Sequence, residues 1–140
     1  MYAPYKQAVL KEWQDKLRAK GIEKKEYLLV YSSQILQESG SLSPLTVGDH
    51  GCSWGVGQKN WCSHEGINAK QALKKYPEWA NLDHQLEWFA TSSKQRLDQH
   101  KEIKWAVVAH NAPAMALKRQ EPRYWKDVNK RAKELEWIEL

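Results

Sequence analysis

The stretch QILQESGSLSPLTVGDHGCSWGVGQ, residues 34–58, decides how this chain folds. It begins as a mostly apolar helical segment, reaches a carboxylate at Glu38, and is interrupted by Gly40 and Pro44. It then continues as a glycine-rich segment, in which tight turns and the close approach of a ligand to the backbone are possible. A helix that ends at an acid, followed by such a loop, predicts a cleft.

The residues before Glu38 predict that this acid ends a buried helical stripe. Leu28, Tyr31 and Ile35 are three and four residues apart, so a helix from about residue 23 places them on one face with Glu38. Partial burial and the negative end of the helix dipole both disfavour the ionised form of Glu38. We therefore expect a raised pKa and a general acid. A Glu that points into solvent is the alternative interpretation.

Three segments, taken in order along the chain, resemble the goose-type lysozyme and lytic transglycosylase superfamily. The first lies within residues 37–58 and contains Gln-Glu-Ser, Gly-Asp-His-Gly and Ser-Trp-Gly-Val-Gly-Gln. The second, Ala-His-Asn-Ala-Pro at 109–113, is similar to the family's Ala-Tyr-Asn-Ala-Gly. The third, Arg-Tyr-Trp-Lys-Asp-Val at 123–128, resembles its late Tyr-containing helix. Together the matches cover about residues 22–128.

The resemblance implies a lysozyme-like α+β fold, predominantly α-helical, with a small irregular β-region and a cleft where the two meet. Propensity alone shows only a glycine-rich loop from Thr46 to Gly57. With 140 residues and no linker, repeat or low-complexity tract, the chain is expected to form a single domain, residues 1–140. Helical spacing and capping residues predict further helices around Val9 to Leu17, from Asn68 to Leu73, from Asn81 or Asp83 to Leu97, from Ile103 to His110, and from about Glu121 to the end.

The resemblance assigns the catalytic roles to two carboxylates. Glu38 matches the family's catalytic acid, and Asp49 is the best candidate for a carboxylate that helps to hold the attacking water. Glycosidic cleavage needs an acid on the leaving oxygen and a group that stabilises or attacks the sugar carbon, so these two roles suffice. An Asp that only closes the His50-Gly51 turn through its own backbone is the alternative interpretation for Asp49.

Five other residues match positions of the substrate groove in that family: Ser53, Gln58, His110, Asn111 and Tyr124. The resemblance implies that Ser53 and Gln58 line the groove, that Asn111 orients the sugar or the loop, and that the Tyr124 hydroxyl bonds near the catalytic acid. Plainer roles are open for three of them. Gln58 can satisfy backbone groups of its loop, Asn111 can end a helix, and Tyr124 can be a core residue with one wet edge.

The chain also departs from the family at three positions. Asn60 lies near the place of a further Asp in goose-type enzymes, and an amide cannot act as a base. This favours the lytic transglycosylase route, in which Glu38 is first acid and then base while the 6-hydroxyl of the substrate attacks and leaves a 1,6-anhydro sugar. His110 replaces a Tyr and Pro113 a Gly, which weakens the site contacts implied at those two positions.

The net charge of +5 and the pI near 9.1 favour an anionic partner. Finger spacings, a basic zipper and aromatic RNA-binding strands are absent from the sequence, so we expect no nucleic-acid partner. No secretory leader is expected from the pattern of the first residues, and no membrane span is expected, since no apolar run is long enough. Tryptophan and tyrosine, which stack well on sugar faces, are frequent.

These features and the resemblance lead us to expect a monomer that cleaves peptidoglycan glycan strands between N-acetylmuramic acid and N-acetylglucosamine. Such a protein is made in the cytoplasm and acts at the bacterial cell wall, as a phage endolysin, a virion component or a bacterial lytic enzyme. No cofactor is needed for this reaction. The alternatives are a chitin-cleaving relative and a non-catalytic wall-binding or structural module with the same fold.

Cys52 and Cys62 enclose the end of the glycine-rich segment. Since a chain without an export signal is made in a reducing compartment, we expect free, buried thiols, although a separation of ten residues also allows a bridge across a β-turn. His50 and His64 lie close to the two cysteines in sequence, but these spacings match no usual zinc site, so no metal is expected.

Overall fold

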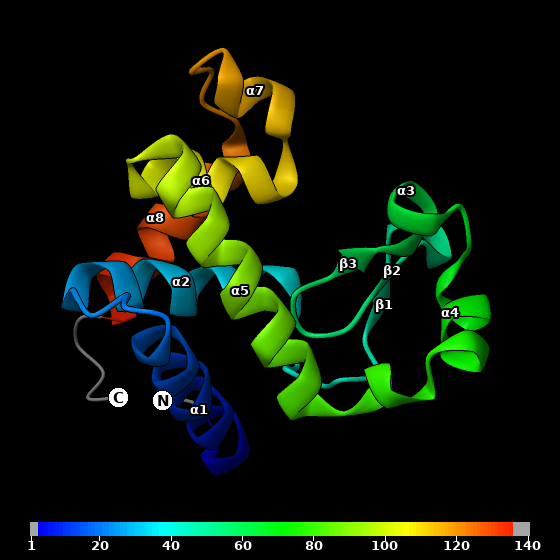
Figure 1. Cartoon of the computed structure of the whole chain (residues 1–140). Coiled ribbons are helices and arrows are strands. Elements are labelled where there is room, and N and C mark those ends of the chain that lie inside the picture. The colour runs from blue at the N-terminus through cyan, green and yellow to red at the C-terminus, as the bar shows by residue number, and fades with distance from the viewer. Residues whose placement is uncertain (1–2, 136–140) are drawn as a thin grey trace.

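A computed structural model, which describes residues 3–135, shows helices around a small antiparallel sheet (Figure 1). The helices are α1 (Pro4–Ala19), α2 (Lys25–Glu38), α3 (Trp61–Glu65), α4 (Ala69–Lys75), α5 (Leu82–His100), α6 (Ile103–Asn111), α7 (Pro113–Leu117) and α8 (Arg123–Leu135). The strands are β1 (Val47–Gly48), β2 (Ser53–Trp54) and β3 (Lys59–Asn60), with 3-10 turns η1 (Asp49–Gly51) and η2 (Pro77–Ala80). The prediction of a predominantly helical α+β chain is confirmed.

The helix ends follow the sequence signals. Asn68 forms a reciprocal capping box with Gln71 at the start of α4, and Asn81, not Asp83, accepts the capping hydrogen bond of α5. Tyr76-Pro77 ends α4, as expected for a residue that precedes proline. The predicted last helix is present as far as Leu135, and the rest of that prediction lies outside the described residues.

The three strands form one antiparallel sheet in the order β1-β2-β3. Val47 pairs with Trp54 and Gly48 with Ser53 across the first two strands, while Ser53 pairs with Asn60 across the second two. Each strand has only two residues. Isolated pairing of this length is not stable in water, so packing against helices must hold the sheet.

The expectation of free cysteines is wrong, because Cys52 and Cys62 form a disulfide. Pairing of β2 with β3 brings the flanking residues together, and the backbone N–H of Trp61 donates to the Cys52 carbonyl (2.8 Å). The Cα atoms of the two cysteines are then 5.2 Å apart, which lies within the usual range for a bridge. The compartment argument failed because local geometry, which the sequence did not reveal, places the two thiols side by side.

The apolar residues gather in two clusters. The larger lies among α1, α2, α5, α6 and α8, and the smaller contains Trp54, Trp61 and Trp79 with alanines of α4. Trp88 of α5 packs against both clusters. Figure 1 shows α5 running between the helical group and the part of the chain that carries the sheet, α3 and α4. Helix α5 therefore joins the two halves of the fold.

Two side chains of α5 hold the glycine-rich segment in place. Gln85 is fully buried; its Oε1 accepts from the backbone N–H of Val56 (2.8 Å), and its Nε2 donates to carbonyls of Pro44 and Trp79. A Cβ at Gly57 would lie 2.6 Å from the Phe89 ring, so only glycine fits there. These contacts fix the sheet against α5. In the part of the chain that the structure describes, no helix is both long and apolar enough to cross a bilayer.

Candidate active site

Glu38 is the last residue of α2, and its side chain is 13% exposed. Burial raises the pKa of Glu38 to about 7, and the charge of Asp49 adds to this rise. The hydrogen bond from Tyr124 and the charge of Arg96 act in the opposite direction. The prediction of a buried acid with a raised pKa is confirmed, and the alternative of a solvent-facing Glu is wrong.

Tyr124 of α8 reaches across to α2, and its hydroxyl donates to Oε1 of Glu38 (2.6 Å). Helix α8 is held against α2 by the Ser33 hydroxyl, which donates to the Val128 carbonyl (2.6 Å), and by Arg131, which donates to the Gln37 side chain (3.0 Å). Burial raises the pKa of Tyr124 well above its ordinary value, so the phenol stays protonated and acts as a donor. The contact that the resemblance implies is therefore present.

His110 of α6 lies beside the same carboxyl group, with its Nε2 3.5 Å from Oε1 of Glu38. This contact is not an ion pair, because burial lowers the pKa of His110 to about 3 and leaves the imidazole neutral. Nε2 is 2.9 Å from the Gly57 carbonyl, which can only accept, so Nε2 carries the proton. His110 thus ties α6 to the glycine-rich segment, and its ring packs on Phe89.

Asp49 begins the turn η1, with an exposed side chain and a left-handed backbone (φ 50°). Its backbone carbonyl accepts from the N–H of Cys52, which closes the turn, and its Oδ2 accepts from the Ser53 hydroxyl (2.5 Å). Ser53 is fully buried. The structure thus places Ser53 behind Asp49 and not in a groove, so the groove contact expected of Ser53 is wrong, whereas Asp49 is both a turn residue and an oriented carboxylate.

Gln58 has the plainer role that the sequence left open. Its amide Nε2 donates to the carbonyls of Gly55 (2.8 Å) and Thr46 (3.1 Å), so it satisfies the backbone of its own loop. A Cβ at Gly48 would displace the end of the Gln58 side chain from its present position. Gln58 nevertheless lines the cavity described next.

A cavity of about 390 Å³ lies between β3 and α3 on one side and α5, α6 and α7 on the other. Its lining includes the predicted groove residues Gln58, His110 and Asn111, the last of which is exposed at the end of α6. Glu38, Asp49, Ser53 and Tyr124 do not line it. The carboxyl group of Glu38 is next to His110, which forms part of the cavity wall.

Two departures from the family have structural roles in this region. Asn60 caps α3, since its Oδ1 accepts from the backbone N–H of Ser63 (3.1 Å). Pro113 occupies the first turn of α7, where a proline needs no N–H partner. Asn60 also lines the cavity, so the amide there serves both the helix and the cavity wall.

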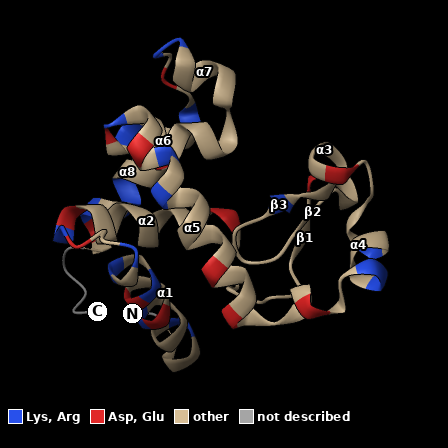
Figure 2. Ribbon diagram, in the orientation of Figure 1, with Lys and Arg blue, Asp and Glu red and all other residues tan. Residues whose placement is uncertain are grey.

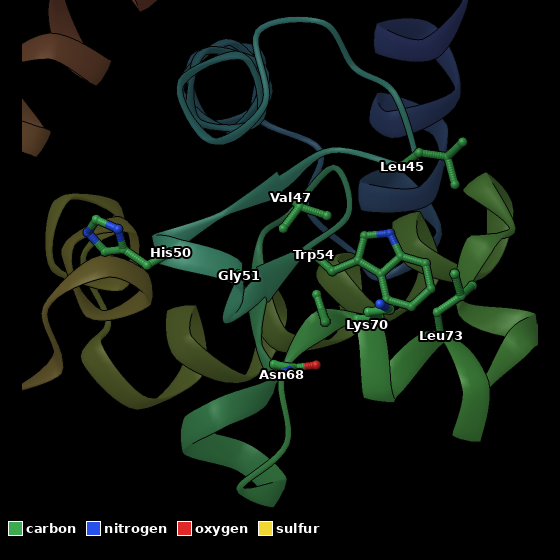
Figure 3. Close-up of a pocket in the computed structure, with 9 residues that line it drawn as sticks. Leu45, Val47, His50, Gly51, Trp54, Asn68, Lys70 and Leu73 are labelled. Carbon is green, nitrogen blue, oxygen red and sulfur yellow. The ribbon is translucent and has the colours of Figure 1, made fainter.

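A different cavity, of about 440 Å³, lies between the sheet and α4 (Figure 3). Leu45, Val47 and Leu73, all largely exposed, line it together with the buried Trp54. Figure 3 shows the His50 ring pointing away from this apolar group. The cavity contains no predicted site residue and no carboxylate. We therefore do not place acid–base chemistry there.

Sequence reasoning missed Lys59, Trp88 and Arg96, which also line the cavity beside Glu38. Arg96 lies seven residues after Phe89, on the same face of α5 as the predicted apolar stripe, and that position could have identified it as inward-facing. Lys59 follows Gln58 directly, but a lone lysine after a motif carries no signal of its own.

Within residues 3–135, no group of three His, Cys, Asp or Glu side chains is arranged to hold a metal ion. Comparisons of the chain with protein-family models, with curated proteins and with solved structures found no match. The function must therefore be argued from the geometry of the site.

Proposed function

We propose that this protein is a peptidoglycan-degrading enzyme with a lysozyme-like fold, which uses Glu38 as general acid to cleave the β-1,4 bond between N-acetylmuramic acid and N-acetylglucosamine. The observation that carries the proposal is the environment of Glu38. Burial raises its pKa to about 7, it accepts a hydrogen bond from Tyr124, and it is next to His110, which lines a cavity between the sheet and the helices. A carboxylic acid that is half protonated at neutral pH suits proton transfer to a glycosidic oxygen.

The two oxygens of Glu38 have different surroundings. Oε1 accepts from Tyr124 and lies near the Nε2–H of His110, whereas Oε2 has no hydrogen-bond partner among the described residues. Oε2 is thus the oxygen that can carry the proton and donate it to the leaving group. After transfer, the carboxylate remains stabilised by the Tyr124 hydroxyl, and this bond strengthens as charge develops.

The second role belongs either to Asp49 or to the substrate itself. The Ser53 hydroxyl orients the carboxylate of Asp49, and the effect of its charge on Glu38 shows that the two groups interact. In the hydrolytic route Asp49 holds water, and in the transglycosylase route the 6-hydroxyl of the muramic acid attacks while Glu38 takes its proton. His110 does not serve as the base through Nε2, since that nitrogen already donates to Gly57.

On this proposal the protein acts as a monomer on glycan strands of the bacterial cell wall and needs no cofactor. Phage release or a place in a virion is consistent with the proposal, as is a bacterial lytic enzyme. The basic net charge supports an anionic polymer as substrate over chitin, which is nearly uncharged.

The test is mass spectrometry of the fragments released from purified peptidoglycan by the wild-type protein, by Glu38→Gln and by Glu26→Gln. Glu26 is an exposed residue in the first turn of the same helix, so its variant is a matched control. We expect fragments from the wild type and the control and at least a thousandfold loss in Glu38→Gln. Anhydro-muramic ends would identify the transglycosylase route, and reducing muramic ends the hydrolytic one.

Absence of fragments from a folded wild-type protein contradicts the proposal on this substrate. Chitin oligomers are then the next substrate to try. If they too remain intact while the protein still sediments with peptidoglycan, the fold serves as a wall-binding module.

A further inference from the structure

The cavity beside Glu38 has an unusual balance of charge. Two basic side chains, Lys59 and Arg96, line it with three histidines, and no Asp or Glu is part of its wall. Figure 2 shows the basic position in β3. The acidic residues of α5 are paired outside this wall: Asp83 and Glu87 with Lys16 and Lys20, and Asp98 with Lys94.

Lys59 extends from β3 over aromatic rings, and its nearest charged partner, Glu65, acts on it only through space. Its Nζ lies 4.0 Å from the ring centre of Trp61, 5.3 Å from that of Trp79 and 5.6 Å from that of Trp88. Among the described residues it has no ion pair within 4 Å, and burial lowers its pKa. Lys59 and Trp88 line this cavity and also a smaller one of about 180 Å³, which Trp61, Trp79 and Glu65 line as well. The side chain of Lys59 therefore lies between the two cavities, and the rings stabilise its ammonium group.

Arg96 is the second unpaired cation. It is partly buried on α5, burial lowers its pKa, and no described residue makes a hydrogen bond or an ion pair with its guanidinium. A guanidinium has five N–H donors in a fixed plane, which suit the two oxygens of a carboxylate. The charges of Glu38 and Glu65 act on Arg96 and Lys59 respectively, but neither carboxylate is in contact with its cation. Desolvated cations with unfilled donors are costly, so an anionic ligand that supplies acceptors binds favourably.

The rest of the wall fits a carboxylate joined to a sugar or a peptide. The amide side chains of Asn60, Gln99 and Asn111 offer hydrogen bonds, and Trp88 offers an apolar face. A volume of about 390 Å³ has room for more than an inorganic anion. The position next to His110 places such a group close to Glu38.

We propose that Lys59 and Arg96 form a carboxylate-binding subsite, which makes cleavage depend on an acidic substituent of the glycan strand. This inference rests on the proposed function, which it deepens by naming the substrate feature that is recognised. The carboxylate is that of the lactyl group or of the peptide stem attached to it. Neutral chitin has neither, and the subsite therefore discriminates against it.

Binding can be tested without catalysis in the Glu38→Gln background. The probes are a disaccharide of N-acetylglucosamine and N-acetylmuramic acid, its methyl ester, and the same disaccharide with an acidic peptide stem. We expect the Kd of the better acidic probe to be at least tenfold lower than that of the ester by calorimetry. The acidic probe whose Kd is lowest relative to that of the ester identifies whether the lactyl or the stem carboxylate is bound.

The key variant is Lys59→Gln, with Lys70→Gln as the matched control, because Lys70 is exposed and lines the apolar cavity instead. Lys59→Gln should bind the acidic probes no more tightly than the ester, whereas Lys70→Gln should keep the difference in affinity seen before this substitution. Arg96→Gln should act in the same direction, and Arg96→Lys, which keeps the charge, should restore part of the difference. Thermal unfolding of each variant confirms that it is folded.

Equal affinity of acid and ester, or an unchanged difference in Lys59→Gln, overturns the subsite. This result is distinguishable from failure of the proposed function. If the wild type cleaves peptidoglycan but binds the ester as tightly as the acid, the proposed reaction is supported and the proposed subsite is contradicted. If the wild type cleaves no substrate but binds the acid more tightly than the ester, the proposed subsite is supported and the proposed reaction is contradicted.

Discussion

At the scale of single residues, the hydrogen bond between Tyr124 and Glu38 should affect how activity depends on pH. The bond stabilises the carboxylate and lowers its pKa, so Tyr124→Phe should raise the pKa of Glu38 further. Hydrogen bonds to charged groups contribute about 1.5–3 kcal/mol, so we expect the alkaline limb of kcat/KM, near pH 7 in the wild type, to move up by about one to two pH units.

The pH profile of Tyr124→Phe should be compared with that of Tyr76→Phe. Tyr76 also donates to a carboxylate, that of Glu65, but at an exposed position. An alkaline limb that stays in place, or that moves to lower pH, would show that Tyr124 does not set the protonation of Glu38.

The raised pKa of Glu38 should also make the stability of the protein depend on pH. Because the pKa of Glu38 is about 7 in the folded protein and near 4.5 when unfolded, the unfolded state binds fewer protons between these values. Folding stability contributed by Glu38 is therefore lost as pH rises from 4.5 to 7, by at most about 3 kcal/mol. Glu38→Gln removes this loss.

Chemical denaturation at pH 4 and at pH 8 measures the effect. We expect Glu38→Gln to be more stable than the wild type at pH 8 and to have a similar stability at pH 4. Glu26→Gln, the exposed control on the same helix, should show no such difference between the two pH values. A stabilisation that is equal at both pH values would mean that ionisation of Glu38 is not its source.

At this scale the sequence predicted Glu38 well and its surroundings only in part. Helical spacing was enough to predict that Glu38 is buried. The resemblance predicted its contact with Tyr124, which lies 86 positions further along the chain. Spacing could not reveal that Ser53 lies behind Asp49, since that contact depends on the left-handed turn at Asp49 and His50. Nor could it show that no residue within 3–135 makes a hydrogen bond or an ion pair with Arg96, because an absent contact depends on every neighbouring element.

At the scale of elements, the glycine-rich segment depends on close contact with α5. Gly57→Ala would place a Cβ 2.6 Å from the Phe89 ring, whereas a Cβ at Gly40 would meet nothing closer than 3.8 Å. Overpacking of this kind costs about 1–3 kcal/mol, so we expect Gly57→Ala to lose that much stability. Denaturant unfolding of Gly57→Ala beside Gly40→Ala measures it, and equal stability of the two would contradict the packing described.

Helices were predictable where strands were not. Caps at Asn68 and Asn81 and the Tyr76-Pro77 stop lie in the local sequence, so helix ends could be predicted from it. The two-residue strands have no periodicity to detect, and their register is held by side chains such as Gln58 and Gln85. These distant contacts are why only the resemblance indicated a β-region.

At the scale of the whole molecule, the Cys52–Cys62 bridge ties α3 to the sheet. A short loop closed by a disulfide contributes about 2–3 kcal/mol to stability in the chain-entropy account. We expect reduction to lower the melting temperature of the wild type, and Cys52→Ala/Cys62→Ala to melt at the lower temperature with or without reductant. Scanning calorimetry checks both. An equal melting temperature for oxidised and reduced protein would show that α3 is held by packing alone.

The tryptophans around Lys59 should make the fluorescence of the protein sensitive to ligand binding. Trp61, Trp79 and Trp88 surround the ammonium group of Lys59, and Trp88 also lines the cavity beside Glu38. The emission of an indole responds to a nearby charge, so a ligand that approaches Lys59 changes the electric field on three fluorophores at once. The protein thus carries a label-free reporter at its own candidate site, by which occupancy can be followed in real time.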